Sequence, residues 1–385
     1  MANPTCYIGL MSGTSLDGVD GVLVEIHDAP GAADAARPRV LQHASRPFLD
    51  VLRQELLALN TAGEDELHRA ALAGTALSQV YAEVVEALLA ASSLPRTAVR
   101  AIGAHGQTVR HRPLAFDGVG YTLQLQNPSL LAERCGIDVV ADFRSRDVAA
   151  GGQGAPLVPA FHAAWFGRPD AAVAVLNIGG IANLSLLPPS GDPAGGPVGG
   201  YDCGPGNALL DHWCRLHTGA PYDADGAWAA TGRVLPALRE ALWTGEPFFA
   251  LPPPKSTGRD LFHPAWLAQR LAACPDAAPA DVQATLTELT VRAAAAGVSS
   301  YRNGSVEELV VCGGGALNGQ LMRGLAAALP GVVVRTSDAH GLPPLQVEAT
   351  AFAWLAQRFM VRAPGNLPAV TGARGLRVLG ALYPA

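Results

Sequence analysis

Residues 13–20 gather glycines, hydroxyls and carboxylates inside a stretch, Tyr7 to Glu25, that is otherwise mostly apolar. The pattern predicts two strands joined by a polar hairpin loop. Glycine lets backbone amides converge on an anion, and Ser and Thr hydroxyls add uncharged donors. An ordinary connecting turn also carries such residues. The candidate phosphate-binding residues of this loop are Gly13, Thr14, Ser15, Leu16, Asp17, Gly18, Val19 and Asp20.

Two later stretches have a related design. Residues 171–187 form an apolar run, a Gly-Gly turn and a second apolar run, and residues 308–321 form an apolar run, three glycines and a helical pattern. The second arrangement places backbone amides at a helix N-terminus, where anions bind. Two similar hairpins suggest a duplicated fold with a cleft between its halves. The candidate nucleotide contacts here are Gly179, Gly180, Asn183, Gly313, Gly314, Gly315 and Asn318.

Asp202 opens the loop Asp-Cys-Gly-Pro-Gly-Asn, and residues 208–216 then become helical in pattern. We expect Asn207 to be the N-cap of that helix, and Gly204 and Gly206 to bring backbone close to a ligand. An Asp at such a place often braces the turn through its own carboxylate. Within a phosphate site it can instead take a proton from an attacking oxygen. The residues alone leave both roles open.

A polar segment also follows the predicted strand 99–104. It contains His105, Gln107 and Thr108. Polar groups at strand ends of α/β folds tend to face a ligand cleft. A histidine there is equally well explained as a hydrogen-bonded structural residue, so ligand contact and a structural role both stay open.

Two further charged residues are candidates. Arg146 follows the apolar strand 137–143, and Glu348 lies in the first turn of a helix whose buried stripe includes Val347, Phe352 and Leu355. A surface ion pair is the alternative for Arg146, and complementing the helix dipole is the alternative for Glu348.

The composition bounds the class of protein. The 385 residues are 49% apolar and 16% charged with a net charge of −6, which suits two globular domains. Basic residues are few and scattered, and no apolar run reaches the length of a membrane span, so we expect a small-molecule partner, no nucleic acid, no membrane and a cytoplasmic location. The six widely spaced cysteines contain no Cys-x-x-Cys, and the sole lysine, Lys255, lacks the glycine spacing of a Walker motif.

The predicted elements alternate as in an α/β fold. Thr61 and Glu64 have the spacing of a capping box ahead of a helix with apolar residues from Leu77 to Leu88. Residues 28–37 are expected to be a linker, and residues 222–259 an insertion. Residues 151–154, Gly-Gly-Gln-Gly, and 342–344 are the expected hinges.

Motifs along nearly the whole chain resemble those of the anhydro-N-acetylmuramic acid kinase family, within the superfamily of sugar kinases, heat-shock ATPases and actin. Such a set in one order is highly specific. The motifs are Gly-Leu-Met-Ser-Gly-Thr-Ser-Leu-Asp-Gly-Val-Asp at 9, His-Gly-Gln-Thr at 105, Ala-Asp-Phe-Arg at 141, Gly-Gly-Gln-Gly-Ala-Pro-Leu at 151, Asn-Ile-Gly-Gly-Ile-Ala-Asn at 177, Asp-Cys-Gly-Pro-Gly-Asn at 202 and Pro-Lys-Ser-Thr-Gly-Arg at 254.

The resemblance implies an α/β fold of two ribonuclease-H-like domains around an ATP cleft, which we expect at residues 1–150 with 346–385 and at 151–345. It implies ATP-dependent opening and phosphorylation of 1,6-anhydro-N-acetylmuramic acid to N-acetylmuramic acid 6-phosphate, in the recycling of cell-wall sugars. Residues 13–20 would then hold ATP phosphates and Asp202 would be the base. Thr108, Arg146 and Glu348 would face the sugar, with His105 and Gln107 beside them.

The first loop departs from the wider superfamily at one position. Met11 stands where an Asp usually precedes the Gly-Thr, so the Mg²⁺ ligands are unknown, with Asp17 and Asp202 as candidates.

We expect a homodimer. Two rival functions stay open on the sequence: a kinase of an ordinary sugar hydroxyl and a non-catalytic ATP-binding switch. A switch would lead one to expect a partner-binding extension, whereas this sequence ends in the compact Gly-Ala-Leu-Tyr-Pro-Ala.

Overall fold

The computed structural model describes residues 5–26, 38–191, 196–258, 261–272, 274–301 and 305–385. The chain divides into two compact units, unit 1 at residues 1–165 with 346–385 and unit 2 at residues 166–345. The first boundary thus follows Trp165, later in the chain than the expected 150. The expected linker at 28–37 lies outside the described residues. No helix among the described residues has the length and apolarity needed to cross a bilayer.

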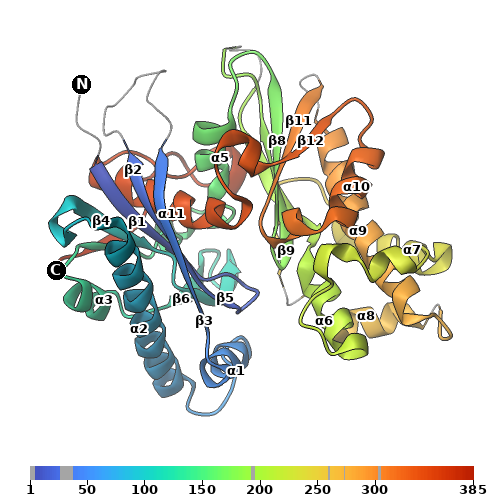
Figure 1. The fold of residues 1–385 in the computed structure, drawn as a ribbon, viewed down its shortest axis with the longest axis horizontal. Helices are drawn as coiled ribbons and strands as arrows, with labels where there is room; N and C mark the ends of the chain where they lie inside the picture. The colour runs from blue at the N-terminus through green and yellow to red at the C-terminus, as the bar shows by residue number, and fades with distance from the viewer. Residues whose placement is uncertain (1–4, 27–37, 192–195, 259–260, 273, 302–304) are drawn as a thin grey trace. The chain divides into compact units, whose positions relative to one another are not determined.

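Unit 1 is built on a six-stranded sheet with the strand order β13-β7-β4-β1-β2-β3. Figure 1 labels its strands β1, β2, β3 and β4. β1, β4 and β7 run parallel, whereas β2, β3 and β13 each run antiparallel to their neighbours. A separate two-stranded sheet pairs β5 with β6. The strands are β1 (Thr5–Met11), β2 (Gly18–Ile26), β3 (Arg39–Pro47), β4 (Val99–Ala104), β5 (Gln107–Pro113), β6 (Gly120–Leu125), β7 (Val139–Ala141) and β13 (Ala381–Tyr383).

Two long helices form hydrophobic cores with this sheet. Apolar residues of α2, such as Leu77 and Val84, form one core with Leu10 of β1. Phe352 of α11 forms another with Tyr7. Because neighbouring residues of a strand point to opposite faces, both faces of β1 are buried. The helices of unit 1 are α1 (Asp50–Ala58), α2 (Glu66–Ser92), α3 (Pro128–Cys135), α4 (Ser145–Ala149), α5 (Val158–Phe166), α11 (Val347–Met360) and α12 (Pro368–Thr371).

Unit 2 repeats the design of unit 1. Its sheet has the order β10-β9-β8-β11-β12, with β8, β11 and β12 parallel and with β9 antiparallel to both β8 and β10. The order and directions match β3-β2-β1-β4-β7 of unit 1, so the predicted α/β class with a duplicated unit is confirmed. The strands are β8 (Ala172–Ile178), β9 (Ile181–Leu187), β10 (Gly199–Pro205), β11 (Val306–Cys312) and β12 (Val333–Thr336).

The core of unit 2 lies between this sheet and its helices. Leu286 and Leu289 of α9 are fully buried in one cluster with Leu176 and Leu184 of the sheet. The helices are α6 (Asn207–Thr218), α7 (Pro236–Trp243), α8 (Pro264–Leu271), α9 (Pro279–Ser299) and α10 (Gly319–Ala328).

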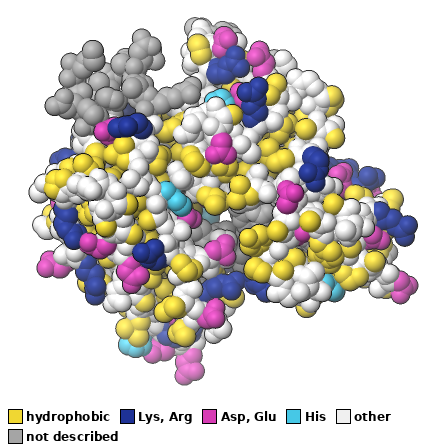
Figure 2. All heavy atoms as spheres, in the orientation of Figure 1, with side chains coloured by type: hydrophobic (Ala, Val, Ile, Leu, Met, Phe, Trp, Pro, Cys, Tyr) yellow, Lys and Arg dark blue, Asp and Glu magenta, His cyan; other side chains and the backbone are white. Residues whose placement is uncertain are grey.

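Charged side chains of both signs are mixed on the surface. On the face shown in Figure 2, Lys and Arg side chains alternate with Asp and Glu side chains, with apolar side chains between them. This mixture agrees with the scattered basic residues of the sequence.

The predicted capping box at Thr61 and Glu64 is wrong. α2 begins at Glu66 after Asp65, which has a φ of 48° and makes no side-chain cap. The Thr61 hydroxyl instead donates to the carbonyl of Ala58 at 3.2 Å, at the end of α1. Glu66 Oε2 accepts the Gly63 N–H at 3.3 Å, but Gly63 precedes the N-cap Asp65, so this bond is not part of a capping box.

Close packing of α11 on the sheet depends on two glycines in neighbouring strands. A Cβ on Gly9 of β1 would collide with the carbonyl of Ala349, and one on Gly103 of β4 with the carbonyl of Phe352. Gly103→Ala should therefore lower the free energy of unfolding by about 1–3 kcal/mol, because backbone atoms cannot make room cheaply. The measurement is urea unfolding.

Gly199→Ala in β10 is the matched control for Gly103→Ala. Its added Cβ would meet only the Leu186 side chain, at an ordinary 3.7 Å. A Gly103→Ala variant as stable as Gly199→Ala would contradict the packing argument.

Candidate functional site

The carboxyl ends of β1 and β4 hold the first candidate loop of unit 1. Ser12 is fully buried, and its Oγ lies 2.9 Å from the Tyr81 hydroxyl and donates to the carbonyl of Gly106 at 3.1 Å. The Gly106 N–H donates to the same Tyr81 oxygen at 3.1 Å. Ser12, the residue before the loop, is therefore tied to α2 and to the segment after β4, and sequence reasoning did not single it out.

His105 holds the same loop from the end of β4. Its Nδ1 lies 3.1 Å from the carbonyl oxygen of Ser12, and its Nε2 accepts from Arg144 at 2.9 Å. Burial, together with the Arg144 charge, lowers the pKa of His105 to about 3. The ring is therefore neutral, with its proton on Nδ1, and both nitrogens are engaged within the protein.

Because His105 is neutral in the folded protein, the free energy of unfolding depends on pH. His162 is also buried, which lowers its pKa to about 3. The unfolded state takes up protons below its own histidine pKa of about 6.5, so the stabilisation is complete above pH 6.5 and is lost as pH falls toward 3. We expect the free energy of unfolding to fall by about 1.4 kcal/mol per pH unit for each histidine.

Urea unfolding between pH 7.5 and 4.5 tests this dependence. His162→Gln should remove part of the slope, and the control His68→Gln replaces an exposed histidine of α2. An unchanged slope in His162→Gln would contradict the assignment for that residue.

The remaining residues of the first loop have different surroundings. Leu16 and Val19 belong to the hydrophobic core, and Asp20 Oδ1 lies 3.4 Å from His43 Nε2 of β3. Thr14 and Asp17 are exposed. Leu16 and Val19 can therefore offer a ligand only their backbone, whereas Thr14 and Asp17 present side chains.

Gln107 and Thr108 lie at the start of β5, directly after His105 and Gly106, which contact Ser12. Gln107 is buried and its Nε2 donates to the carbonyl of Gly13 at 3.1 Å. Thr108 is half-buried, and its hydroxyl accepts from Gln124 of β6 at 3.2 Å. Gln107 thus shapes the loop.

Arg146 and Glu348 lie on two different helices of unit 1. Arg146 is exposed on α4, which packs against β6. Glu348 is half-buried in the first turn of α11, as predicted. α4 thus lies against β6, which pairs with the strand β5 that carries Thr108.

Three glycine-containing loops meet at one edge of the unit 2 sheet. The N–H groups of Gly206 and Ala208 donate to the carbonyl of Gly180 at 3.1 and 3.2 Å, and that of Asn207 donates to Gly179 at 2.8 Å. Gly313, with a φ of 77°, packs so closely that a Cβ would collide with Asn177 and Ile178. The loops after β8, β10 and β11 therefore form one junction, as parallel strand ends predict.

Two predictions about helix starts at this junction need correction. α6 begins at Asn207 with Gly206 as its N-cap, and Asn207 Nδ2 instead donates to the carbonyl of Ile178 at 3.2 Å. The three glycines lead into a 3₁₀ turn, Gly314–Leu317, and α10 begins only at Gly319. Asn318 is its N-cap, accepting from Gln320 and Leu321, so its carboxamide oxygen already has partners.

Asp202 lies half-buried on β10, opposite Asn183 of β9. Its Oδ2 accepts the Thr257 N–H at 3.0 Å, which fixes the carboxylate. Asn183 Oδ1 and Thr257 Oγ1 are both buried with no hydrogen-bond partner among the described residues. Because buried polar atoms are nearly always paired, two unpaired oxygens beside one carboxylate mark a place where a ligand's polar groups would bind.

Lys255 supports the segment that holds Asp202. The carbonyl of Lys255 accepts the Asp202 N–H at 3.3 Å. Its Nζ donates to the carbonyl of Phe248 at 3.1 Å and lies 4.6 Å from the centre of the Phe248 ring. Burial lowers the pKa of Lys255. The lysine thus has a structural role, which the Pro-Lys-Ser-Thr-Gly-Arg motif alone did not predict.

The cysteines are all free, and five of the six are buried, as expected. Burial and the nearby Asp202 charge raise the pKa of Cys203 to about 12. The thiol beside the candidate base is therefore protonated and is no nucleophile. Within the described residues, no group of three or more His, Cys, Asp or Glu could hold a metal ion.

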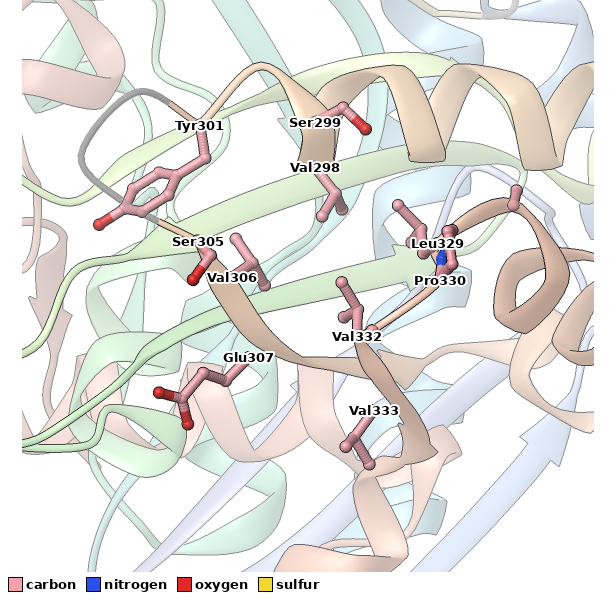
Figure 3. A pocket seen from close by; sticks show the side chains of 12 residues that line it. Val298, Ser299, Tyr301, Ser305, Val306, Glu307, Leu329, Pro330, Val332 and Val333 are labelled. Atoms are coloured by element: carbon pink, nitrogen blue, oxygen red, sulfur yellow. The ribbon is translucent and has the colours of Figure 1, made fainter.

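A cavity of about 680 Å³ lies at the other end of the unit 2 sheet. Figure 3 shows Val298, Val306 and Val333 among its lining side chains, at the end of α9 and the beginnings of β11 and β12. The glycine junction lies at the opposite, carboxyl ends of these strands. The cavity contains none of the predicted site residues.

Comparison with known proteins gives a consistent result. The model of the anhydro-N-acetylmuramic acid kinase family matches residues 5–385. The anhydro-N-acetylmuramic acid kinase of Variovorax paradoxus is 64% identical over 98% of this chain and 99% of its own, and that of Bordetella petrii is 61% identical over 98% and 96%.

Solved structures resemble the chain more distantly. An activator of 2-hydroxyisocaproyl-CoA dehydratase from Clostridium difficile, with bound ADPNP, has a TM-score of 0.46 at 12% identity, covering 93% of this chain and 96% of its own. A ROK family glucokinase from Streptomyces griseus, with glucose and AMPPNP, has a TM-score of 0.42 at 11% identity, covering 91% and 98%.

Proposed function

The chain belongs to the anhydro-N-acetylmuramic acid kinase family and is an ATP-dependent carbohydrate kinase, and from this we propose how its residues act on the anhydro sugar. The reaction opens the 1,6-anhydro ring of 1,6-anhydro-N-acetylmuramic acid with water and transfers the γ-phosphoryl group of ATP to give N-acetylmuramic acid 6-phosphate. We place it in the cytoplasm, in the recycling of cell-wall sugars, and we expect a homodimer.

Each unit offers loops that suit the phosphates of a nucleotide. In unit 1 the loop 13–20 offers backbone amides and the Thr14 hydroxyl, and its shape is held by Ser12 and His105. In unit 2 the junction of the Gly179, Gly206 and Gly313 loops supplies closely packed backbone and the positive end of the α6 dipole, while the N–H groups of Asn207 and Ala208 already donate to Gly179 and Gly180. The dipole at a helix N-terminus favours an anion such as phosphate.

Magnesium would accompany the nucleotide. Mg²⁺ in kinases is typically held by one or two carboxylates together with phosphate oxygens and waters, so it needs no cluster of protein ligands. The exposed carboxylate of Asp17 and the fixed carboxylate of Asp202 suit that role. When bound, the metal would neutralise charge on the transferred phosphoryl group.

Asp202 would be the general base. Its carboxylate would take a proton from a water molecule as that oxygen attacks the anomeric carbon. The bond from this carbon to the sugar O6 would break, and O6 would attack the γ-phosphorus as ADP leaves. The observation that carries the proposal is the position of Asp202, which is fixed by Thr257 and lies beside the unpaired oxygens of Asn183 and Thr257.

Thr108, Arg146 and Glu348 of unit 1 would contact the sugar, while His105 and Gln107 would act through the loop that they hold. The test is incubation with ATP and a panel of plain and anhydro sugars, followed by measurement of ADP and of the sugar phosphate. We expect one equivalent of ADP per equivalent of 6-phosphate, formed only from the anhydro sugar with an N-acetylmuramic acid skeleton. Phosphorylation of plain sugars alone, or ADP release with no sugar phosphate, would refute the proposal.

A further inference from the structure

A continuous chain of hydrogen bonds runs through unit 1 to the loop at residues 13–20. It starts at Asp147 of α4, a fully buried carboxylate whose Oδ2 accepts the Gly154 N–H at 2.8 Å. The Gly154 carbonyl accepts from Arg144 Nη1, also at 2.8 Å. Because Arg144 is the N-cap residue of α4, this one helix and its cap hold both polar groups of Gly154.

The Asp147 end of the chain is itself anchored. Its Oδ1 accepts from Asn366 Nδ2 and from the Thr371 hydroxyl, both at 2.8 Å. The Gly152 N–H donates to the Asp147 carbonyl at 2.9 Å. Both oxygens of this carboxylate are therefore in use, as a buried charge requires. The chain is fixed at this end to α4, to the segment 152–154 and to α12.

Arg144 also fixes the orientation of His105. Its Nη2 and Nε lie 2.9 and 3.3 Å from His105 Nε2, the acceptor nitrogen of the neutral ring. The other ring nitrogen, Nδ1, donates to the Ser12 carbonyl at 3.1 Å. A guanidinium group presents several N–H donors in one rigid plane, so Arg144 can bond the Gly154 carbonyl and the imidazole together. The ring cannot turn without losing a hydrogen bond at each nitrogen.

The contacts with the loop decide which way its amides point. The Ser12 carbonyl accepts from His105, and the Gly13 carbonyl accepts from Gln107 Nε2 at 3.1 Å. Both peptide bonds are trans, and the C=O and N–H of a trans peptide point in opposite directions. The N–H groups of Gly13 and Thr14 therefore point away from the segment that follows β4. Neither N–H has an acceptor in the part of the chain that the structure describes.

Successive backbone N–H groups that converge in this way form sites for anions. We propose that Arg144 is a positioning residue for the nucleotide, which acts through His105 to orient the peptide that presents the Gly13 N–H, with Thr14 beside it, to a phosphate group of ATP. The proposal rests on the proposed function, which supplies ATP as the ligand of this loop. It gives Arg144 a role that the Ala-Asp-Phe-Arg motif alone did not predict.

Calorimetric titration of the full chain with ATP, without sugar, tests this role. His105→Leu should weaken ATP binding about 10–100-fold, the range for hydrogen bonds to a charged group, and Arg144→Leu about tenfold. The double variant should bind ATP about as His105→Leu does, because without the ring Arg144 has nothing to orient. His105→Asn should restore most of the affinity, since its Nδ2 lies close to the position of the ring Nδ1 and can donate to Ser12.

Arg96→Leu is the matched control. Arg96 of unit 1 also donates through Nη1 to a backbone carbonyl, that of Cys135 at 3.0 Å, so its loss removes a similar contact elsewhere. This variant should bind ATP as the wild type does. If Arg144→Leu does not fold, Arg144→Lys replaces it, because a single ammonium cannot hold both partners in the geometry of the guanidinium and should still weaken ATP binding several-fold.

Three results would overturn the proposal: wild-type ATP affinity in the Arg144 variant, additive losses in the double variant, or His105→Asn as weak as His105→Leu. Additive losses would mean that Arg144 acts on ATP independently of His105. The proposed function is judged separately, by turnover of the anhydro sugar. If the wild type phosphorylates no anhydro sugar but the ATP affinities follow the expected pattern, the function is wrong and the positioning role stands. If the sugar is phosphorylated and Arg144→Leu binds ATP normally, the positioning role alone is refuted.

Discussion

Asp202→Asn should lower turnover by about 100-fold or more while the affinities for sugar and ATP change little. Asn can still accept the Thr257 N–H through its carboxamide oxygen, so the contact at 3.0 Å can survive. It cannot take the proton of the attacking water. The measurement is turnover together with calorimetric binding of sugar and of ATP on one preparation.

Asp117→Asn is the matched control. Asp117 accepts the N–H groups of Val119 and Gly120 in the β5–β6 turn, a purely structural use of the carboxylate. That variant should keep near-normal turnover, because Asn serves well in turns. Near-normal turnover in Asp202→Asn would reduce Asp202 to the same role. Loss of ATP affinity together with turnover would point to magnesium binding and leave Glu348 as the next candidate base.

Gly313→Ala should disrupt the loop junction of unit 2. At a φ of 77° any Cβ is strained, and here it would also collide with Asn177 Oδ1 and the carbonyl of Ile178. We expect the free energy of unfolding to fall by about 3 kcal/mol, from strain and overpacking together. ATP affinity, measured by calorimetry on the folded variant, should fall about 100-fold because the three loops can no longer pack together.

Gly331→Ala separates the two causes. Gly331 has a φ of 88°, and no heavy atom lies within 4 Å of the position that a Cβ would take there, so this variant carries the strain without the collision. It should cost about 1 kcal/mol and leave ATP binding unchanged. If Gly313→Ala bound ATP as tightly as Gly331→Ala, the junction would have no part in nucleotide binding.

The repeated hairpins show what a local sequence pattern can predict about the fold. Apolar runs around polar turns predicted both hairpins, and the structure has β1 with β2 and β8 with β9 in antiparallel pairs. Hydrophobic periodicity is a local property, so it survives into the fold. Helix starts fared less well. Asn207 and the triple glycine lie one to several residues from the true N-caps, because the Asn207 side chain donates to Ile178 and the Asn318 side chain caps α10.

The sequence by itself determined the α/β class, the duplicated unit, the glycine loops and, through its motifs, the family. These follow from residue types and short spacings, which a chain carries without folding. Only the tertiary structure decided what each polar side chain does. His105 holds Ser12, Lys255 braces the Asp202 segment, and Arg146 lines one cavity with Arg374, which lies more than two hundred residues later in the chain. Such partners are brought together by sheet order and helix packing, so burial and charge at these sites depend on contacts that no local pattern contains.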